Sequence, residues 1–224
     1  MYEIEIKSLL GSKERADELK RHLMQLFPAL RAFPPHKQRN FYFNTPSDLS
    51  VVEKVARTFL SLKKQTELSR IVKNAKGNVS IRTRDADGKA LFILKASIGD
   101  DTSANGVSRI EFEEPVTLSF DELNTRLTEA GLVYQAKWSR EREHFDLGSI
   151  HITIDKNAGY GYLAEFEKML DDGGEAKYAK KELKALMTEL KCTELPQERL
   201  ERMFTYYNEH WPEYYGTDKV FTVE

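Results

Sequence analysis

At 224 residues, with 40% hydrophobic and 31% charged side chains, the chain is long enough to bury a core and is predicted to be one large soluble domain with or without appendages. Its formal charge of -2 argues against a protein whose main partner is nucleic acid. The single Cys192 cannot form an intramolecular disulfide, and the first residues contain no stretch apolar enough for a signal peptide or a membrane span. We therefore expect a cytoplasmic protein without a membrane partner.

The first part of the chain mixes strand and helix patterns. Residues 2–7 alternate charged and apolar side chains, which predicts a strand with two faces of different character. Leucines at helical spacing predict a helix over 12–27, which Pro28 ends. Residues 38–45 are rich in aromatic side chains and precede a proline, so they are predicted to form a strand. The apolar positions over 47–76 then predict a helical insertion.

Strand patterns dominate the middle of the chain. Asp87 and Gly88 mark a hairpin between strands over 80–84 and 91–96, and a short helix is predicted over 120–130. The remaining predicted strands cover residues 106–114, 133–145, 150–155 and 162–170. Eight strands make an even set that can close. The sequence therefore predicts an α+β, mainly β fold: an eight-stranded antiparallel closed β-barrel with surrounding helices.

The last part of the chain is predicted to be helical. Residues 1–172 hold all the predicted strands, and residues 173–224 form a helical C-terminal extension. Its two helices are predicted over 175–190 and 196–210. Beyond Trp211 we expect irregular packing or disorder.

Charged side chains two residues apart recur on one face of the predicted strands, while the other face is apolar. One such face alone is typical of the solvated side of an antiparallel sheet. Arginine pairs and glutamate pairs sit in separate strands here, however, and this sorting favours a binding surface inside a closed sheet. Arginine and lysine bind phosphate oxygens, and carboxylates bind Mg²⁺ or Mn²⁺. The charged sets are Glu3/Glu5/Lys7, Arg82/Arg84, Arg109/Glu111/Glu113, Arg140/Arg142 and Glu165/Glu167, with Lys95 and Asp155 alone.

Several of these residues belong to motifs that follow one another in a definite order. The first is Glu-x-Glu-x-Lys, at Glu3 to Lys7. The later motifs are NFYFNTP (40–46), IRTR (81–84), ILK (93–95), RIEFE (109–113), SRER (139–142), TID (153–155) and GYLAEFE (161–167). Over roughly residues 1–170 this order resembles the triphosphate tunnel metalloenzymes, also called the CYTH superfamily. The insertion over 47–76 is longer than the usual connection in that family.

The resemblance implies a tunnel of eight antiparallel strands in which a triphosphate is hydrolysed with Mg²⁺ or Mn²⁺. The catalytic residues that it implies are Lys7 and Tyr42, the tyrosine helping to orient or activate the attacking water. The metal-binding carboxylates that it implies are Glu3, Glu5, Glu111, Asp155, Glu165 and Glu167. The triphosphate clamp that it implies consists of Lys7, Arg82, Arg84, Lys95, Arg109, Arg140 and Arg142.

Several alternatives stay open from the sequence. The partner that the resemblance implies is a small-molecule triphosphate, and inorganic triphosphate, thiamine triphosphate and nucleoside triphosphates all share the phosphates that such a clamp contacts. A class IV adenylyl cyclase would share the same motifs, and a noncatalytic polyphosphate or nucleotide sensor would share the fold. A monomer and a homodimer are both compatible with the sequence. The histidines show no close metal-ligand spacing and are expected to pack in the core or on the surface; they are His22, His36, His144, His151 and His210.

Overall fold

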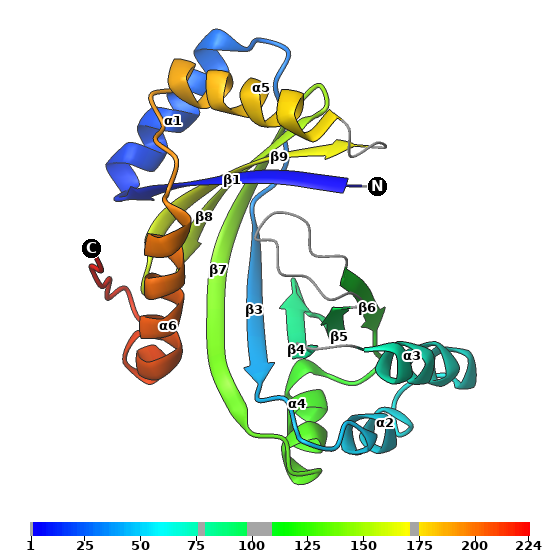
Figure 1. Ribbon diagram of the computed structural model, residues 1–224. Helices are drawn as coiled ribbons and strands as arrows, with labels where there is room; N and C mark the ends of the chain where they lie inside the picture. The colour runs from blue at the N-terminus through cyan, green and yellow to red at the C-terminus, as the bar shows by residue number, and fades with distance from the viewer. Residues whose placement is uncertain (1, 76–78, 98–108, 171–174) are drawn as a thin grey trace. The chain divides into compact units, whose positions relative to one another are not determined.

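The computed structural model describes residues 2–75, 79–97, 109–170 and 175–224 (Figure 1). The chain divides into two units. The first unit consists of Met1–Lys37 and Ser139–Glu224, and the second of Gln38–Trp138. Among the described helices, none is long and apolar enough to cross a membrane.

The first unit is an antiparallel sheet with two of its helices over one face. Its strands follow the order β1-β9-β8-β7, and every neighbouring pair is antiparallel. The short strand β2 pairs with β7. The elements are β1 (Tyr2–Gly11), α1 (Lys13–Leu26), β2 (Arg31–Ala32), the second part of β7 (Tyr134–Leu147), β8 (Ile150–Asn157), β9 (Gly161–Leu170), α5 (Ala176–Glu189) and α6 (Gln197–Tyr214).

The second unit is also an antiparallel sheet accompanied by helices. Its strands follow the order β3-β4-β5-β6. The turn between β4 and β5 has positive φ at both central residues, +49° at Asp87 and +86° at Gly88, which is the conformation that an Asp-Gly hairpin favours. The elements are β3 (His36–Phe43), α2 (Ser50–Ala56), α3 (Leu62–Asn74), β4 (Val79–Ala86), β5 (Lys89–Ser97), β6 (Arg109–Pro115), α4 (Phe120–Glu129) and the first residues of β7.

The predicted α+β class is confirmed, because the structure is a mostly antiparallel sheet accompanied by helices. The described part of the chain forms a sheet of nine strands rather than eight, and β2 is the addition. Closure of the barrel is not confirmed: the described strands run β1-β9-β8-β7-β3-β4-β5-β6, and within this part of the chain no hydrogen-bonded pairing joins β1 to β6. Residues 106–108 of the predicted strand over 106–114 lie outside the described residues.

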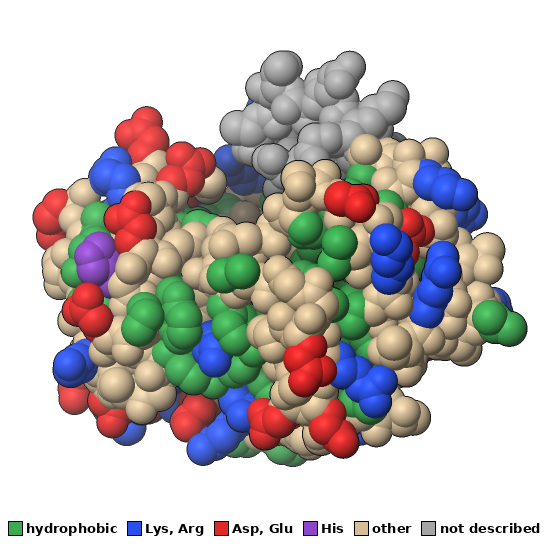
Figure 2. Space-filling view, turned by 90° about the horizontal axis from the view of Figure 1, so that it is seen from below, with side chains coloured by type: hydrophobic (Ala, Val, Ile, Leu, Met, Phe, Trp, Pro, Cys, Tyr) green, Lys and Arg blue, Asp and Glu red, His purple; other side chains and the backbone are tan. Residues whose placement is uncertain are grey.

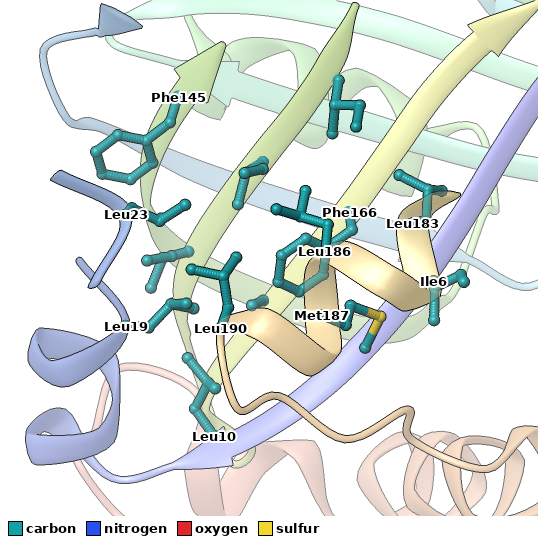
Figure 3. Close-up of a cluster of buried hydrophobic side chains, with 14 of the residues drawn as sticks. Ile6, Leu10, Leu19, Leu23, Phe145, Phe166, Leu183, Leu186, Met187 and Leu190 are labelled. Carbon is teal, nitrogen blue, oxygen red and sulfur yellow. The ribbon is translucent and has the colours of Figure 1, made fainter. Parts of the chain in front are cut away.

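The core of the first unit lies between its sheet and the helices α1 and α5 (Figure 3). The apolar side chains that meet there include Ile6, Leu10, Leu19, Leu23, Phe145, Ile152, Ile154, Phe166, Leu183, Leu186 and Met187. Because successive side chains of a strand point to opposite faces, burying Ile6, Ile154 and Phe166 turns Lys7 and Asp155 to the other face. The packing of α1 and α5 thus determines which face of the sheet is polar.

The core of the second unit includes a buried polar pair. Thr83 on β4 donates its hydroxyl to Oδ1 of Asn124 on α4 at 2.8 Å, and both side chains are buried. Ser119 and Glu122 form a capping box that starts α4 and so fixes where Asn124 projects. The apolar side chains around this pair include Phe41, Phe43, Ile81, Phe92, Leu94 and Leu123. The alternate residues of β3 and β4 consequently face away from this core.

The C-terminal segment packs within the first unit. Helix α5 supplies Leu183, Leu186 and Met187 to its core. Helix α6 ends at Tyr214 rather than near residue 210, so the expectation of irregular structure beyond Trp211 is wrong for residues 212–214. The continuation of the helix buries Tyr214 against Phe221, with ring centroids 5.3 Å apart. The boundary between residues 172 and 173 stays a prediction.

Of the glycines that the structure describes, Gly161 is the one where a side chain has least room. Its φ is +71°, and a Cβ atom there would lie 2.3 Å from the carbonyl oxygen of Gly11 on the neighbouring strand. We expect Gly161→Ala to lower the free energy of unfolding by about 3 kcal/mol, since backbone strain of about 1–2 kcal/mol adds to displacement of β1. The control is Gly148→Ala, where φ is +62° but nothing lies within 4 Å. If urea unfolding showed the same loss of stability for both variants, the steric clash with the Gly11 carbonyl oxygen would be contradicted.

Candidate functional site

Charged side chains from four strands of the first unit meet on the face opposite its apolar core. The β1–β9 register sets Lys7 across from Glu165 and Glu5 across from Glu167. The β7–β8 register sets Arg142 across from Asp155. Neighbouring side chains on one face of an antiparallel sheet lie within reach of each other, so these residues interact.

The innermost part of this face is a network around Asp155, whose side chain is only 1% exposed. Arg142 donates from Nε to Oδ1 of Asp155 at 2.7 Å and from Nη2 to Oδ2 at 2.6 Å. Arg140 donates from Nη1 to Oδ2 at 3.2 Å. The two-point contact fixes the plane of the Arg142 guanidinium. Asp155 therefore orients both arginines in this arrangement.

Glu165 joins Arg142 to Lys7. Its carboxylate accepts from Arg142 Nη2 at 2.5 Å and from Lys7 Nζ at 2.9 Å, and Lys7 also pairs with Glu5. Burial by itself would lower the pKa of Lys7, but the carboxylates of Glu165 and Glu5 raise it. Burial would raise the pKa of Glu165, yet the charges of Lys7 and Arg142 lower it to about 2. Both groups are thus held in their charged forms.

Glu5 and Glu167 form a pair of like charges beside this network. They are directly opposite each other on β1 and β9, and the pKa of Glu167 is raised, first by its burial and then by the Glu5 carboxylate. Two carboxylates that share a site repel each other, and a divalent cation between them would relieve the repulsion. Among the described side chains of the first unit, this pair therefore offers two facing carboxylates for a hard cation.

The second unit carries a smaller polar face. Tyr42 lies opposite Arg82, and Asn40 lies opposite Arg84 in the β3–β4 register. Arg82 Nη1 donates to the Tyr42 hydroxyl at 3.0 Å, and Arg84 Nε donates to Asn40 Oδ1 at 3.0 Å. Arg84 also approaches the Glu113 carboxylate at 3.4 Å. Each arginine is therefore oriented by a neighbour on the same face.

The predicted site residues thus appear in two groups, one in each unit. In the first unit the structure brings together Glu5, Lys7, Arg140, Arg142, Asp155, Glu165 and Glu167. In the second unit Tyr42 contacts Arg82, and Lys95 shares the face of the arginines by strand register. The side chains of Glu3, Arg109 and Glu111 lie outside the described residues.

Two features of these faces were not predicted. Asn40 contacts Arg84, and its position on the same side of β3 as Tyr42 is the signal that could have identified it. Glu113, which the sequence places in a charged row but not in the metal or phosphate sets, also contacts Arg84. The hairpin of β7 and β8 also gathers His144, Asp146 and His151, with their potential ligand atoms within 4.8 Å of one another. Sequence spacing did not reveal the group because only the hairpin register brings its members together.

Acid unfolding tests the pairing of Glu165. A carboxyl group whose folded pKa is below its unfolded value, about 4.3, stabilises the protein above that value and loses this contribution as the pH falls toward the folded pKa. Since the folded pKa of Glu165 is about 2, we expect its contribution, roughly 3 kcal/mol, to disappear between about pH 4.5 and pH 2. Urea unfolding across this range should show a shallower pH dependence for Glu165→Gln than for the parent chain. If the free energy of unfolding changed equally with pH in both proteins, the ion pairs of Glu165 would be contradicted.

Charge on the exterior is mixed. Figure 2 shows basic and acidic side chains interspersed with apolar ones on the face that it draws, rather than one sign gathering there. The overall balance is 34 basic against 36 acidic residues. The described side chains on this face accordingly form no extended basic surface of the kind that nucleic-acid binding uses.

The described structure defines an α+β protein whose antiparallel sheet carries an apolar face under helices and a polar face of paired arginines, lysines and carboxylates. The CYTH domain family matches residues 1–198, and the chain therefore belongs to this family. No curated protein matches the chain.

Solved structures share the fold. The PH1819 protein from Pyrococcus horikoshii is 18% identical with a TM-score of 0.59, over 92% of this chain and 99% of that one. The PH1012 protein from the same organism is 16% identical with a TM-score of 0.57, over 88% and 93%. A "putative adenylate cyclase" from Vibrio parahaemolyticus is 18% identical with a TM-score of 0.58, over 92% and 98%. At these identities the likeness extends to the fold alone.

Proposed function

We propose that this chain hydrolyses a small-molecule triphosphate with the help of Mg²⁺ or Mn²⁺. Membership of the CYTH domain family supports a triphosphate-related activity. The observation that carries the proposal is the charged face of the first unit. There Asp155 and Glu165 hold two arginines and Lys7 in place beside the facing carboxylates of Glu5 and Glu167.

The cations are suited to hold phosphate oxygens. Arg142 uses Nε and Nη2 on carboxylates, which fixes its orientation and leaves donors of its guanidinium for a ligand, since an arginine carries five N–H groups. Donors that are oriented before the substrate arrives lose little entropy on binding and need no rearrangement as negative charge develops. The proposed clamp comprises Lys7, Arg140 and Arg142 with Arg82, Arg84, Lys95 and Arg109.

The residues present fit a hard divalent cation. Glu5 and Glu167 would hold it, because they supply facing oxygen ligands, and burial together with the Glu5 carboxylate raises the pKa of Glu167. When bound, such an ion supplies charge neutralisation and polarisation of phosphate oxygens and water. Glu3, Glu111, Asp155 and Glu165 complete the proposed ligand set. Of these, Asp155 and Glu165 also position the arginines and Lys7.

Tyr42 is proposed to orient the attacking water. Its hydroxyl oxygen accepts from Arg82, so its own proton is directed elsewhere and can be donated to a water molecule. We expect Tyr42→Phe to lower kcat by about 10-fold to 100-fold with a much smaller change in KM, because the ring stays in place while the hydroxyl is lost. Steady-state kinetics check this; a change confined to KM would assign Tyr42 to substrate binding.

The test of the function is a substrate panel on the full chain. Inorganic triphosphate, thiamine triphosphate and ATP are each incubated with Mg²⁺, with Mn²⁺ or with a chelator, and orthophosphate release is measured. Metal-dependent release from at least one substrate is the expected result. A panel in which none is turned over would overturn the hydrolase assignment.

The second candidate is a class IV adenylyl cyclase, the activity that the name of the Vibrio parahaemolyticus neighbour suggests. In that reaction the ribose hydroxyl of ATP attacks and pyrophosphate leaves. Cyclic AMP and pyrophosphate from ATP would therefore favour the cyclase, and orthophosphate would favour the hydrolase. Tight triphosphate binding without either product would identify a binding module.

A further inference from the structure

We propose that His144, Asp146 and His151 bind a first-row divalent transition ion, with Zn²⁺ as the preferred occupant, on the hairpin formed by β7 and β8. This site does not depend on the proposed hydrolysis. It differs from the carboxylate site in ligand chemistry, because nitrogen donors form most of it.

The hairpin brings three potential ligand atoms close together. Asp146 lies directly across from His151 in the β7–β8 register, and His144 precedes Asp146 on the same face of β7. Oδ1 of Asp146 lies 2.6 Å from Nδ1 of His151 and 2.9 Å from Nε2 of His144. One carboxylate oxygen thus sits between two imidazole nitrogens that belong to the two strands of a single hairpin.

The ring of His144 is held in place without a hydrogen bond at this nitrogen. Among the described residues, Nε2 of His144 has no hydrogen-bond partner of acceptable geometry, although it is shielded from solvent and close to Asp146. Phe33 stacks on the ring at a centroid distance of 4.9 Å, and its backbone N–H donates to the His144 carbonyl at 3.0 Å. A ring nitrogen that is shielded from solvent, close to a carboxylate and without a hydrogen bond is a feature that a bound cation would explain.

Ligand chemistry selects the ion. Two imidazoles and a carboxylate suit Zn²⁺ and its first-row neighbours, whereas Mg²⁺ prefers oxygen ligands. Tetrahedral ligands at about 2.0–2.1 Å from a zinc ion lie about 3.3 Å apart. The nitrogen–oxygen distances here are 2.6 and 2.9 Å, so a shift of less than about 1 Å in the Asp146 carboxylate would admit the ion. Water would occupy the remaining position, as in sites with three protein ligands.

A hydrogen-bonded triad is the rival explanation. In it Asp146 would accept hydrogen bonds from both imidazoles and hold the hairpin together without any metal. The rival predicts no metal uptake, whereas the proposed site predicts one ion per chain. The β8–β9 register also sets His151 across from Glu167, so the experiment has to separate this site from the carboxylates.

The experiment uses the full chain after chelator treatment and dialysis. Zn²⁺ binding is measured by titration calorimetry in excess Mg²⁺, and Co²⁺ is used as a spectroscopic probe of nitrogen coordination. We expect about one equivalent of Zn²⁺, visible Co²⁺ absorption bands, and an affinity about 100-fold lower in His144→Gln and in His151→Gln. The parent chain should also show a higher Tm with Zn²⁺, and His151→Gln should not.

Two further variants serve as matched controls. His22→Gln removes a half-buried histidine on α1, and Glu5→Gln removes a carboxylate of the proposed hard-cation site; both should keep the Zn²⁺ affinity and the Co²⁺ bands. Absence of uptake by the parent chain overturns the proposal in favour of the hydrogen-bonded triad. Uptake that survives in both histidine variants and is lost in Glu5→Gln also overturns it, because the carboxylates would then be the binding site. If a histidine variant fails to fold, Asp146→Asn takes its place, with the same loss of Zn²⁺ affinity expected.

Discussion

Glu167→Gln is expected to reduce metal-dependent triphosphate turnover by about 100-fold or more, the size of effect that follows loss of a group stabilising transition-state charge. The amide keeps the shape of the side chain but carries no negative charge, so the facing pair with Glu5 loses the feature that suits a divalent ion. Orthophosphate release over a range of Mg²⁺ concentrations measures the loss. Partial recovery at high Mg²⁺ is expected, because the substitution weakens binding of the ion.

The matched control for this substitution is Glu141→Gln. Glu141 lies on β7 between Arg140 and Arg142, so it points to the opposite face, where it pairs with Lys37 at 3.1 Å. We expect this variant to keep full turnover, since the same chemical change is made away from the charged face. Full turnover in Glu167→Gln would remove Glu167 from the metal site. Equal losses in both variants would point to a general effect of charge rather than to a ligand.

The sequence predicts which side chains share a face of a strand, because the alternation of side chains along a strand depends only on neighbouring residues. Alternation over residues 2–7 is enough to place Lys7 away from Ile6, and the structure buries Ile6 in the core. The same alternation places Arg142 and Phe145 on opposite faces of β7, and Phe145 lies in the core. The Asp87–Gly88 hairpin could be predicted because its two positive φ angles are what this dipeptide favours.

Contacts between distant strands could not be predicted in this way. That Lys7 pairs with Glu165 depends on β9 lying next to β1, which is a matter of strand order rather than of alternation. The two-residue strand β2 is too short to give a periodic signal in the sequence. It is a strand because it pairs with β7. The end of α6 was misplaced for a related reason: burial of Tyr214 against Phe221 extends the helix beyond what local pattern indicates.

Asp155 shows how the polar face depends on one buried charge. Its carboxylate is almost entirely removed from water and receives three hydrogen bonds from Arg142 and Arg140. Removing one partner of a buried ion pair leaves the other charge without compensation, which costs about 3–5 kcal/mol. Glu165 stays in contact with Arg142 at 2.5 Å and offsets part of this cost for that arginine.

We therefore expect Asp155→Ala to lower the free energy of unfolding by about 3 kcal/mol, measured by urea unfolding, and to weaken triphosphate binding because both arginines lose their orientation. Asp218→Ala is the control: Asp218 pairs with Lys156 at 2.7 Å, but its side chain is 89% exposed, so we expect no measurable change in the unfolding midpoint. The comparison isolates burial, since each substitution removes an aspartate from an ion pair. An Asp155→Ala protein as stable as the parent chain would show that the arginines do not depend on this carboxylate, and the preorganised clamp would lose its physical basis.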